Sequence, residues 1–359
     1  MRRDEVAGRR GRVGGLIRVS PQRKAAAVSL PLPLSILDLA TVGDGETIRE
    51  GLDASVALAQ RAEEQGFRRI WYAEHHNMRA VASSATSVLI AHVAAHTERI
   101  TLGSGGVMLP NHSPLVIAEQ FGTLATLHPG RIELGLGRAP GTDQQTVGAL
   151  RRDPRASEQF PQDVQELQAF LSDESLVPGV HAFPGRGTAV PLTILGSSLY
   201  GAQVAAALGL PYAFASHFAP DALEQAVAVY RREFRPSAQL AAPRVLAAVN
   251  VVAADSADEA AQSLHAVQRD RVKRFLSRGG QELTDDEAEA VLDAPAGAQV
   301  RSMTRYTASG TPDVVVGYLE EFARKADADE LIVTFPVVDR PAWFRSFELL
   351  AEQVRPVGV

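Results

Sequence analysis

The chain has 359 residues, of which 45% are hydrophobic and 22% charged, and this composition predicts a globular protein long enough to bury a full core. Its formal net charge is -6 and it contains no cysteine. These two facts exclude a basic nucleic-acid-binding surface, disulfide bonds, zinc–thiolate sites and a cysteine nucleophile, and they favour a cytoplasmic protein.

The first 33 residues are rich in arginine and glycine and show no hydrophobic periodicity. We expect a disordered extension or a misassigned start here, outside a folded part at residues 34–359. Arg12, Arg18, Arg23 and Lys24 interrupt the apolar run that a signal peptide requires. No stretch of the sequence reaches the roughly 20 apolar residues that span a bilayer.

Predicted strands and helices alternate along the rest of the chain. The eight predicted strands are residues 34–40, 69–74, 100–109, 131–137, 191–196, 211–216, 244–253 and 330–337. The predicted helices are residues 47–65, 84–97, 115–127, 162–171, 198–208, 221–234, 256–277, 284–292, 311–325 and 341–354, and residues 297–309 are expected to be irregular. This alternation predicts an α/β fold of the TIM (β/α)8 barrel type, with an open doubly wound sheet as the alternative.

Two long segments interrupt the alternation. Residues 141–190 hold one amphipathic helix and much loop, and we expect this insertion to act as a lid, because long loops in compact folds are often functional. Residues 256–310 are predicted to form a second, helical insertion.

Polar residues end the second predicted strand, in the run Trp71-Tyr72-Ala73-Glu74-His75-His76-Asn77. Two histidines beside a glutamate at the end of an apolar strand favour a functional role over a merely polar tip. Metal binding is one candidate. It is disfavoured because consecutive strand residues point to opposite faces, so the three side chains cannot converge without a bend.

A second candidate site combines Arg138, after the fourth strand, with the run Gly196-Ser197-Ser198, after the fifth. Main-chain N–H groups at a helix N-terminus, together with hydroxyls and a nearby cation, suit a phosphate group. The alternative is that Ser197 or Ser198 is a simple helix N-cap.

The glycine-rich run Gly103-Ser104-Gly105-Gly106 is not a dinucleotide fingerprint, because the G-x-G-x-x-G spacing is absent. Glycines inside a strand indicate a bulge or a flat ligand close to the main chain. Residues 135–141 likewise lack the ending of a Walker motif.

With these residues the chain resembles the bacterial luciferase-like flavin-dependent monooxygenases, and most closely their single-chain, alkanal-monooxygenase-like branch. The resemblance lies in the motifs WYAEHHN, LGSGGVMLPNHSPLVIAEQFGTL, GRIELGLGRAPGTD and GSSLYGAQVAAALGLPYAFASHFAPD, which cover nearly all of residues 34–219. The later ASGTPDVV matches the family's usual entry into a helix.

The resemblance implies a TIM barrel that binds reduced FMN, supplied by a separate flavin reductase, and reacts it with O2. The resulting flavin hydroperoxide would oxidise an aldehyde or another small organic substrate. His75 matches the family's catalytic histidine, and Gly105–Gly106 matches a cis peptide bond that shapes the ring pocket. Arg138 and the Ser197–Ser198 turn match the family's phosphate-side residues, and we expect Ala139 and Gly196 beside them to contact the cofactor as well.

The resemblance also implies a homodimer through the helices at residues 84–97 and 115–127. Both are unusually apolar for the outside of a barrel, and an apolar helix face must be covered.

Two departures from the family pattern limit what can be carried over. The light-emitting luciferase subunit has a cysteine at Gly137 and an acidic residue at Gly196, so light emission is not implied. Its second phosphate-contacting arginine has no clear counterpart here, and Arg151, Arg152 and Arg155 are the candidates. A flavin- or deazaflavin-dependent dehydrogenase, a non-catalytic flavin-binding protein and a metal hydrolase remain as alternative functions.

Overall fold

The computed structural model describes residue 30, residues 32–276 and residues 283–353. Its strands are β1 (Leu34–Asp38), β2 (Arg69–Tyr72), β3 (Thr101–Met108), β4 (Ile132–Gly137), β5 (Leu192–Gly196), β6 (Tyr212–Phe214), β7 (Val245–Ala253), β8 (Thr307–Gly310) and β9 (Glu330–Thr334). Its α-helices are α1 (Ile48–Glu64), α2 (Thr86–Ala94), α3 (Pro114–Leu127), α4 (Gln144–Ala149), α5 (Phe160–Leu171), α6 (Leu199–Leu208), α7 (Leu223–Glu233), α8 (Ala257–Leu276), α9 (Asp285–Asp293), α10 (Gly297–Met303), α11 (Pro312–Lys325) and α12 (Arg340–Gln353). Two short 3-10 helices are η1 (Leu109–Asn111) and η2 (Pro154–Glu158).

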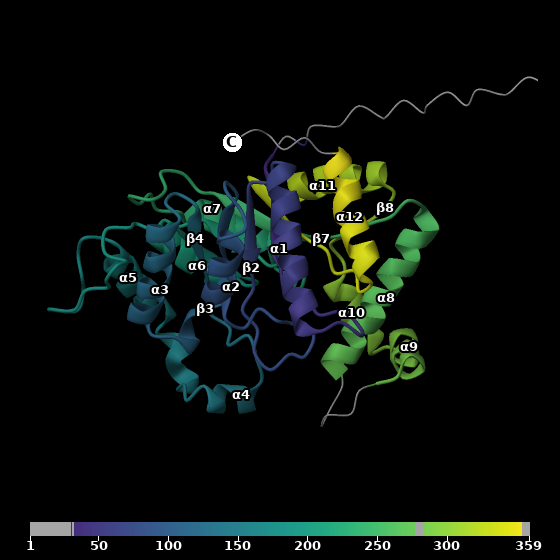
Figure 1. Ribbon diagram of the computed structural model, residues 1–359, viewed down its shortest axis with the longest axis horizontal. Helices are drawn as coiled ribbons and strands as arrows, with labels where there is room; N and C mark the ends of the chain where they lie inside the picture. Colours follow the sequence, from purple (N-terminus) through teal and green to yellow (C-terminus); the bar gives the residue numbers. More distant parts are fainter. Residues whose placement is uncertain (1–29, 31, 277–282, 354–359) are drawn as a thin grey trace, which may run out of the picture.

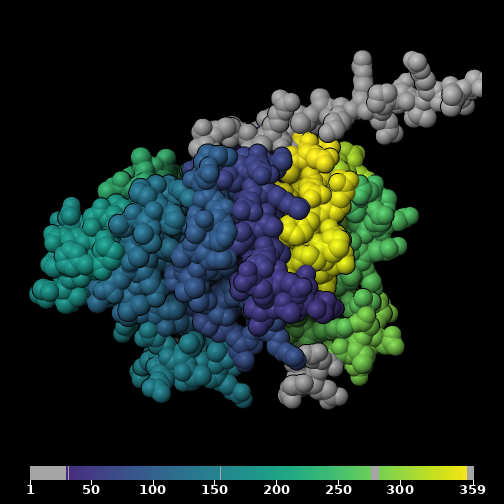
Figure 2. Space-filling model, in the orientation of Figure 1, coloured from purple at the N-terminus to yellow at the C-terminus, as the bar shows by residue number. Residues whose placement is uncertain are grey.

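Eight parallel strands close into a barrel. The hydrogen-bonded order runs β6-β5-β4-β3-β2-β1-β9-β7, and a further pairing of β6 with β7 completes the ring. The first and last strands meet where Leu34 pairs with Leu331. Figures 1 and 2 show this as the purple α1 beside the yellow α12, which an ion pair between Arg61 and Glu348 joins at 2.7 Å. The predicted TIM barrel is confirmed.

Local signals explain where helix α1 begins and ends. Thr47 and Glu50 form a capping box, in which the Glu50 N–H donates to Thr47 Oγ1 and the Thr47 N–H donates to the Glu50 carboxylate. Gly66 then adopts a φ of +74°, which glycine tolerates without strain, and the chain turns into β2.

The prediction of irregular structure at residues 297–309 was wrong. This segment holds α10 and β8, and β8 pairs with the C-terminal half of β7, from Asn250 to Ala253. The sequence of β8 is Thr-Ala-Ser-Gly, which lacks the apolar run that marks the other strands. β8 therefore forms only by pairing with the edge of β7, and the local sequence pattern does not predict it.

Most of the segment predicted as a lid packs on the barrel. Helix α5 is the crossover between β4 and β5, and it buries Phe160, Val164, Leu167 and Phe170. The loop after α5 also rests on α3, because a Cβ at Gly122 would lie 2.0 Å from the Gly185 Cα. Only residues 141–159 stay candidates for a lid, and their helix α4 lies at the lower end of the molecule in Figure 1.

The predicted N-terminal extension lies outside the described residues, except for its last part. Leu30 is 1% exposed and joins the core, so the packed structure begins slightly before β1. None of the helices in the described ranges has both the length and the apolar character required to cross a membrane.

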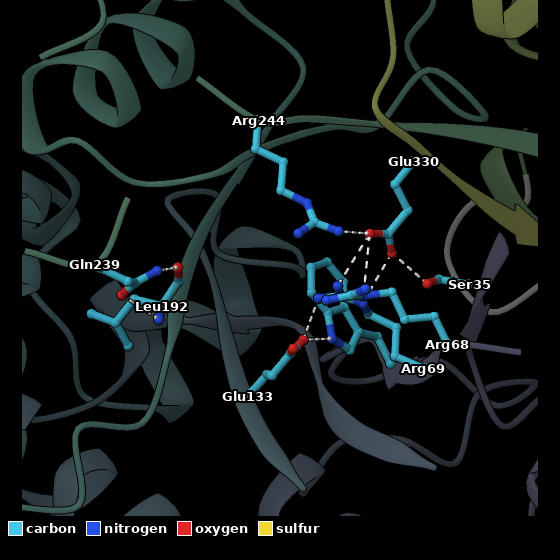
Figure 3. A network of polar contacts seen from close by, with 9 residues as sticks. Ser35, Arg68, Arg69, Glu133, Leu192, Gln239, Arg244 and Glu330 are labelled. Atoms are coloured by element: carbon cyan, nitrogen blue, oxygen red, sulfur yellow. Dashed lines mark hydrogen bonds and ion pairs between the residues drawn. The ribbon is translucent and has the colours of Figure 1, made fainter. Parts of the chain in front are cut away.

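Charged side chains fill the N-terminal end of the barrel interior (Figure 3). Glu330 of β9 is fully buried and lies 3.0 Å from Arg69 Nε and 2.7 Å from Arg244 Nη2, and it accepts a hydrogen bond from the Ser35 hydroxyl. Arg69 also pairs with Glu133 of β4. We call Ser35, Arg69, Glu133, Arg244 and Glu330 the N-terminal network.

Candidate active site at the C-terminal end of the barrel

Glu74, directly after β2, is a buried carboxylate that joins the C-terminal ends of β2 and β3. Its side chain is 1% exposed and pairs with His76 Nε2 at 2.8 Å and His112 Nε2 at 2.9 Å. The Met108 N–H, at 3.0 Å, and the Asn111 amide, at 3.4 Å, also donate to it. Burial alone would raise the pKa of Glu74, but hydrogen bonds from His112 and His76 outweigh burial and lower the pKa to about 2. Glu74 is therefore an anion that fixes the loops around it.

His75 makes different contacts from its neighbour His76. Its Nδ1 is buried and has no hydrogen-bond partner among the described residues. Burial lowers the pKa of His75, although the Gly141 main chain and the Glu74 charge act in the opposite direction. The hydrogen bond to Glu74 instead raises the pKa of His76. One histidine thus belongs to the carboxylate cluster, and the other has a lowered pKa and a buried Nδ1 without a partner among the described residues.

The sequence did not show that His112 joins Glu74. His112 follows η1, 38 positions further along the chain, and the parallel pairing of β2 with β3 brings the two together. Within the described ranges, no group of three or more His, Cys, Asp or Glu side chains is placed to hold a metal ion.

The glycine run of β3 forms a bulge in the barrel wall. The register with β4 shifts between Ser104 and Val107, and the Gly105–Gly106 peptide bond is cis. A Cβ on Gly105 would lie 2.7 Å from the Leu37 side chain, and one on Gly106 would lie 2.8 Å from the Gly135 oxygen. Packing inside the barrel therefore requires glycine at both positions, independently of any ligand.

Arg138 and Gly196 lie side by side at the ends of β4 and β5. The strand register pairs Gly137 with Leu195, so the next residue of each strand reaches the same level. The Arg138 guanidinium lies 4.2 Å from the ring centre of Tyr200 in α6 and is exposed, as is Ala139. The structure thus brings the cation of β4 to the first turn of α6.

The N-terminus of α6 is open. Ser198 occupies the N-cap position, but its side chain does not cap the helix. Ser197 and Ser198 are both exposed, and the first N–H groups of a helix have no partner within the helix. The simple N-cap interpretation of these serines is therefore not what the structure shows.

The three candidates for a second phosphate-binding arginine lie in the segment around α4 and η2. Arg152 Nε donates to the Asn111 carbonyl at 2.9 Å, and Arg155 lies 3.9 Å from Asp153. Arg151 is exposed and has a φ of +55°. None of these contacts connects the three arginines with Arg138 in the part of the chain that the structure describes.

His217, three residues beyond β6, is a site residue that the sequence analysis did not single out. It lines a small pocket of about 40 Å³ together with Trp71, Gly105 and Leu195. Its Nδ1 is buried without a partner in the described structure. Burial, with repulsion from Arg271 and His75, lowers the pKa of His217 to about 3. The sequence signal that could have identified His217 is its position shortly after a barrel strand, where functional residues of this fold gather.

Comparisons with known proteins identify relatives of the whole barrel. A luciferase-like monooxygenase family profile matches residues 32–329. A protein of Escherichia coli strain K12 named luciferase-like monooxygenase is 47% identical over 89% of this chain and 96% of its own length. The N-acetyl-S-alkylcysteine monooxygenase of Bacillus subtilis is 32% identical over 89% of this chain and 98% of its own.

Solved structures agree in fold. The crystal structure of apo-MsnO8 superposes with a TM-score of 0.80 at 35% identity, over 90% of this chain and 98% of that one. The oxygenating constituent of 3,6-diketocamphane monooxygenase from Pseudomonas putida, in complex with FMN, reaches 0.67 at 17% identity over 91% of this chain and 99% of that one. An F420-dependent secondary alcohol dehydrogenase reaches 0.63 at 15% identity over 90% and 99%, so these last two show the fold alone.

Proposed function

We propose that this chain, which belongs to the luciferase-like monooxygenase family and is a flavin-dependent monooxygenase, uses reduced FMN and O2 to oxidise a small organic substrate such as an aldehyde. A separate flavin reductase would supply the reduced FMN. The observation that carries this proposal is the position of an exposed arginine and an open helix N-terminus at the same barrel end as a half-buried histidine whose Nδ1 has no hydrogen-bond partner among the described residues.

The phosphate of FMN fits the ends of β4 and β5. Arg138 has no ion-pair partner in the described structure, and its stacking on Tyr200 holds the guanidinium beside α6. The open N–H groups after Ser197 and Ser198 carry the positive end of the helix dipole. A dianionic phosphate would satisfy both, and neutral Ala139 and Gly196 leave room beside it.

The remaining residues suit the chemistry of oxygen activation. Reduced flavin supplies the two electrons that O2 requires. The pocket beside Gly105 is lined almost entirely by apolar side chains, such as Leu37, Leu195 and Ile332, which keep water out. His75 is neutral at working pH because burial lowers its pKa, so its imidazole can accept a proton from a bound ligand or return one.

The first experiment is a titration of FMN, followed by fluorescence quenching, with Arg138→Ala. A charge-assisted hydrogen bond is worth about 1.5–3 kcal/mol, so the variant should bind at least roughly tenfold more weakly. Arg99→Ala, at the opposite end of the barrel before β3, is the matched control and should bind as wild type does. An Arg138→Ala affinity within about twofold of wild type would refute the phosphate assignment.

The second experiment separates the two histidines by their effect on turnover. His75→Ala should keep its FMN affinity but oxidise aldehydes roughly a hundredfold more slowly, as expected for the loss of an acid–base group. His76→Ala is the comparison, because His76 contacts Glu74 instead. The turnover of both variants is measured by product formation and oxygen uptake, with reduced FMN supplied. A wild-type protein that takes up no oxygen would be a dehydrogenase or a flavin-binding protein.

We also propose a homodimer through α2 and α3. The structure corrects part of the sequence argument, because Leu89, Ile90 and Val93 of α2 face the core. The outer face still exposes Val88 at 68% and, in α3, Leu127 at 65%. An exposed apolar face of this kind supports self-association. Light scattering at micromolar concentration should give twice the monomer mass, and Val88→Asp should reduce it to the monomer; a monomeric wild type would end this proposal.

A further inference from the structure

The loop after β6 is held unusually firmly for a surface connection. Ser216 is fully buried, and its hydroxyl donates to the Ala248 carbonyl of β7 at 2.5 Å. The ring of Phe218 lies 5.8 Å from that of Phe275, so α8 covers the loop from outside. His217 lies between these two anchors and cannot move far from its position at the pocket.

Two side chains hold the main chain of His217. Asn250 of β7, which is fully buried, donates from Nδ2 to the His217 carbonyl at 2.8 Å. The guanidinium of Arg271, from α8, lies 3.4 and 3.5 Å from the same oxygen. It also donates to the Met303 carbonyl at 3.1 Å. Burial lowers the pKa of Arg271 to about 10, so it stays charged at neutral pH.

These contacts position an imidazole whose Nδ1 atom makes no hydrogen bond within the described structure. His217 Nδ1 is buried without a hydrogen-bond partner among the described residues, and so is His75 Nδ1. Burial, with repulsion from Arg271 and His75, lowers the pKa of His217 to about 3, so its imidazole is neutral at neutral pH. An unsatisfied buried nitrogen is costly, and such groups are paired in most proteins.

We propose that His217 Nδ1 forms a hydrogen bond with the bound flavin ring and that Arg271 and Asn250 position it for this contact. The proposal rests on the proposed function, and it adds a ligand-binding residue opposite His75. The flavin is favoured over the substrate because His217 shares its pocket with Gly105, where the family resemblance implies that the flavin ring binds. A neutral imidazole can donate or accept at Nδ1, and a flavin ring offers both kinds of partner.

The test measures FMN affinity by fluorescence quenching in His217→Leu and His217→Asn. Leucine removes the hydrogen bond and should weaken binding roughly fivefold, the usual effect of one neutral hydrogen bond. Asparagine places an amide near the position of Nδ1 and should stay within about twofold of wild type. His128→Leu, which removes a histidine after α3, is the matched control and should bind normally.

Arg271→Met tests the positioning role through a double variant. It should weaken FMN binding about as much as His217→Leu, and combining the two should weaken it no further, because both act through one contact. Thermal unfolding checks that each variant is folded. Additive losses would overturn the positioning role of Arg271.

The outcomes separate this inference from the proposed function. If wild-type protein does not bind FMN, the proposed function fails and the inference with it. If wild type binds and His217→Leu binds equally well, only the inference is overturned.

Discussion

The barrel has a buried carboxylate at each end, and the two differ in their partners. At the N-terminal end, Glu330 is fully buried and is surrounded by Arg69, Arg244 and, at 3.7 Å, Arg68. At the C-terminal end, Glu74 is paired with the imidazoles of His76 and His112. Figure 3 shows the first arrangement, in which planar guanidinium groups approach a single carboxylate.

The difference separates stability from chemistry. Arginine keeps its charge at every pH at which the protein is folded, so the N-terminal network is a permanent arrangement of fixed charges. Histidine can gain or lose its proton near neutral pH, and it lies at the end of the barrel where catalytic residues of this fold gather. The carboxylate at each end is equally buried, and only the choice of partner makes one end responsive to protons.

The largest expected effect follows from removing the Glu330 charge. Glu330→Gln leaves the buried Arg69 and the half-buried Arg244 without their shared counter-ion, and the free energy of unfolding should fall by about 3–5 kcal/mol. Urea unfolding measures this loss, and FMN affinity of the folded variant should be unchanged. Arg49→Met, which removes an exposed ion pair with Asp53 on α1, is the control and should have no measurable effect. A loss below about 1 kcal/mol for Glu330→Gln would contradict the role given to this network.

Removing the Glu74 charge should cost less, and the cost should depend on pH. Glu74→Gln should lower the free energy of unfolding by about 1–3 kcal/mol, because the partly exposed rings of His76 and His112 can hydrogen-bond to water when the carboxylate is lost.

The pH dependence has a definite sign. The raised pKa of His76 adds stability below about 6.5 that is lost as the pH rises through its folded value. The lowered pKa of Glu74 adds stability above its ordinary value of 4.5 that is lost as the pH falls toward 2. The difference between wild type and Glu74→Gln should therefore be largest between these limits. Equal pH profiles for the two variants would remove the distinction between the two ends.

Local sequence pattern was sufficient for the barrel but not for its polar networks. Each strand of the ring carries its own apolar run, and helices such as α1 carry their own caps, so both could be predicted from short windows. Strand β8 could not be predicted from a short window, because its four small residues form a strand only beside β7. The pairing of Arg69 with Glu330 joins residues 261 positions apart, and no local window contains it.

The candidate site also contains residues that the local sequence pattern predicts and others that it does not. His75, Arg138 and Ser198 follow apolar strands within three residues, and parallel strands bring their ends together, so position along the chain was enough to predict that they lie at one end of the barrel. His217 and its support from Arg271 were missed, because α8 belongs to an insertion whose packing on the loop after β6 is a tertiary contact. The sequence analysis explained the glycines of β3 only in part, since neighbouring atoms inside the barrel already exclude a Cβ.

The smallest effect tests whether the C-terminal end also contains a group that resists protonation. Burial, with Arg271 and His75 nearby, lowers the pKa of His217 to about 3, so its neutral form adds stability above about 6.5. That contribution is lost as the pH falls from about 6.5 toward the folded value, because the unfolded chain then binds the extra proton. His217→Asn carries no such group. Between pH 7.5 and 5.5 it should therefore lose about 1 kcal/mol less stability than wild type, measured by urea unfolding. Burial also lowers the pKa of His128, without a value as low as that of His217, so His128→Asn should depart from wild type in the same direction but by less. Parallel curves for wild type and His217→Asn would show that His217 is hydrated enough to protonate normally.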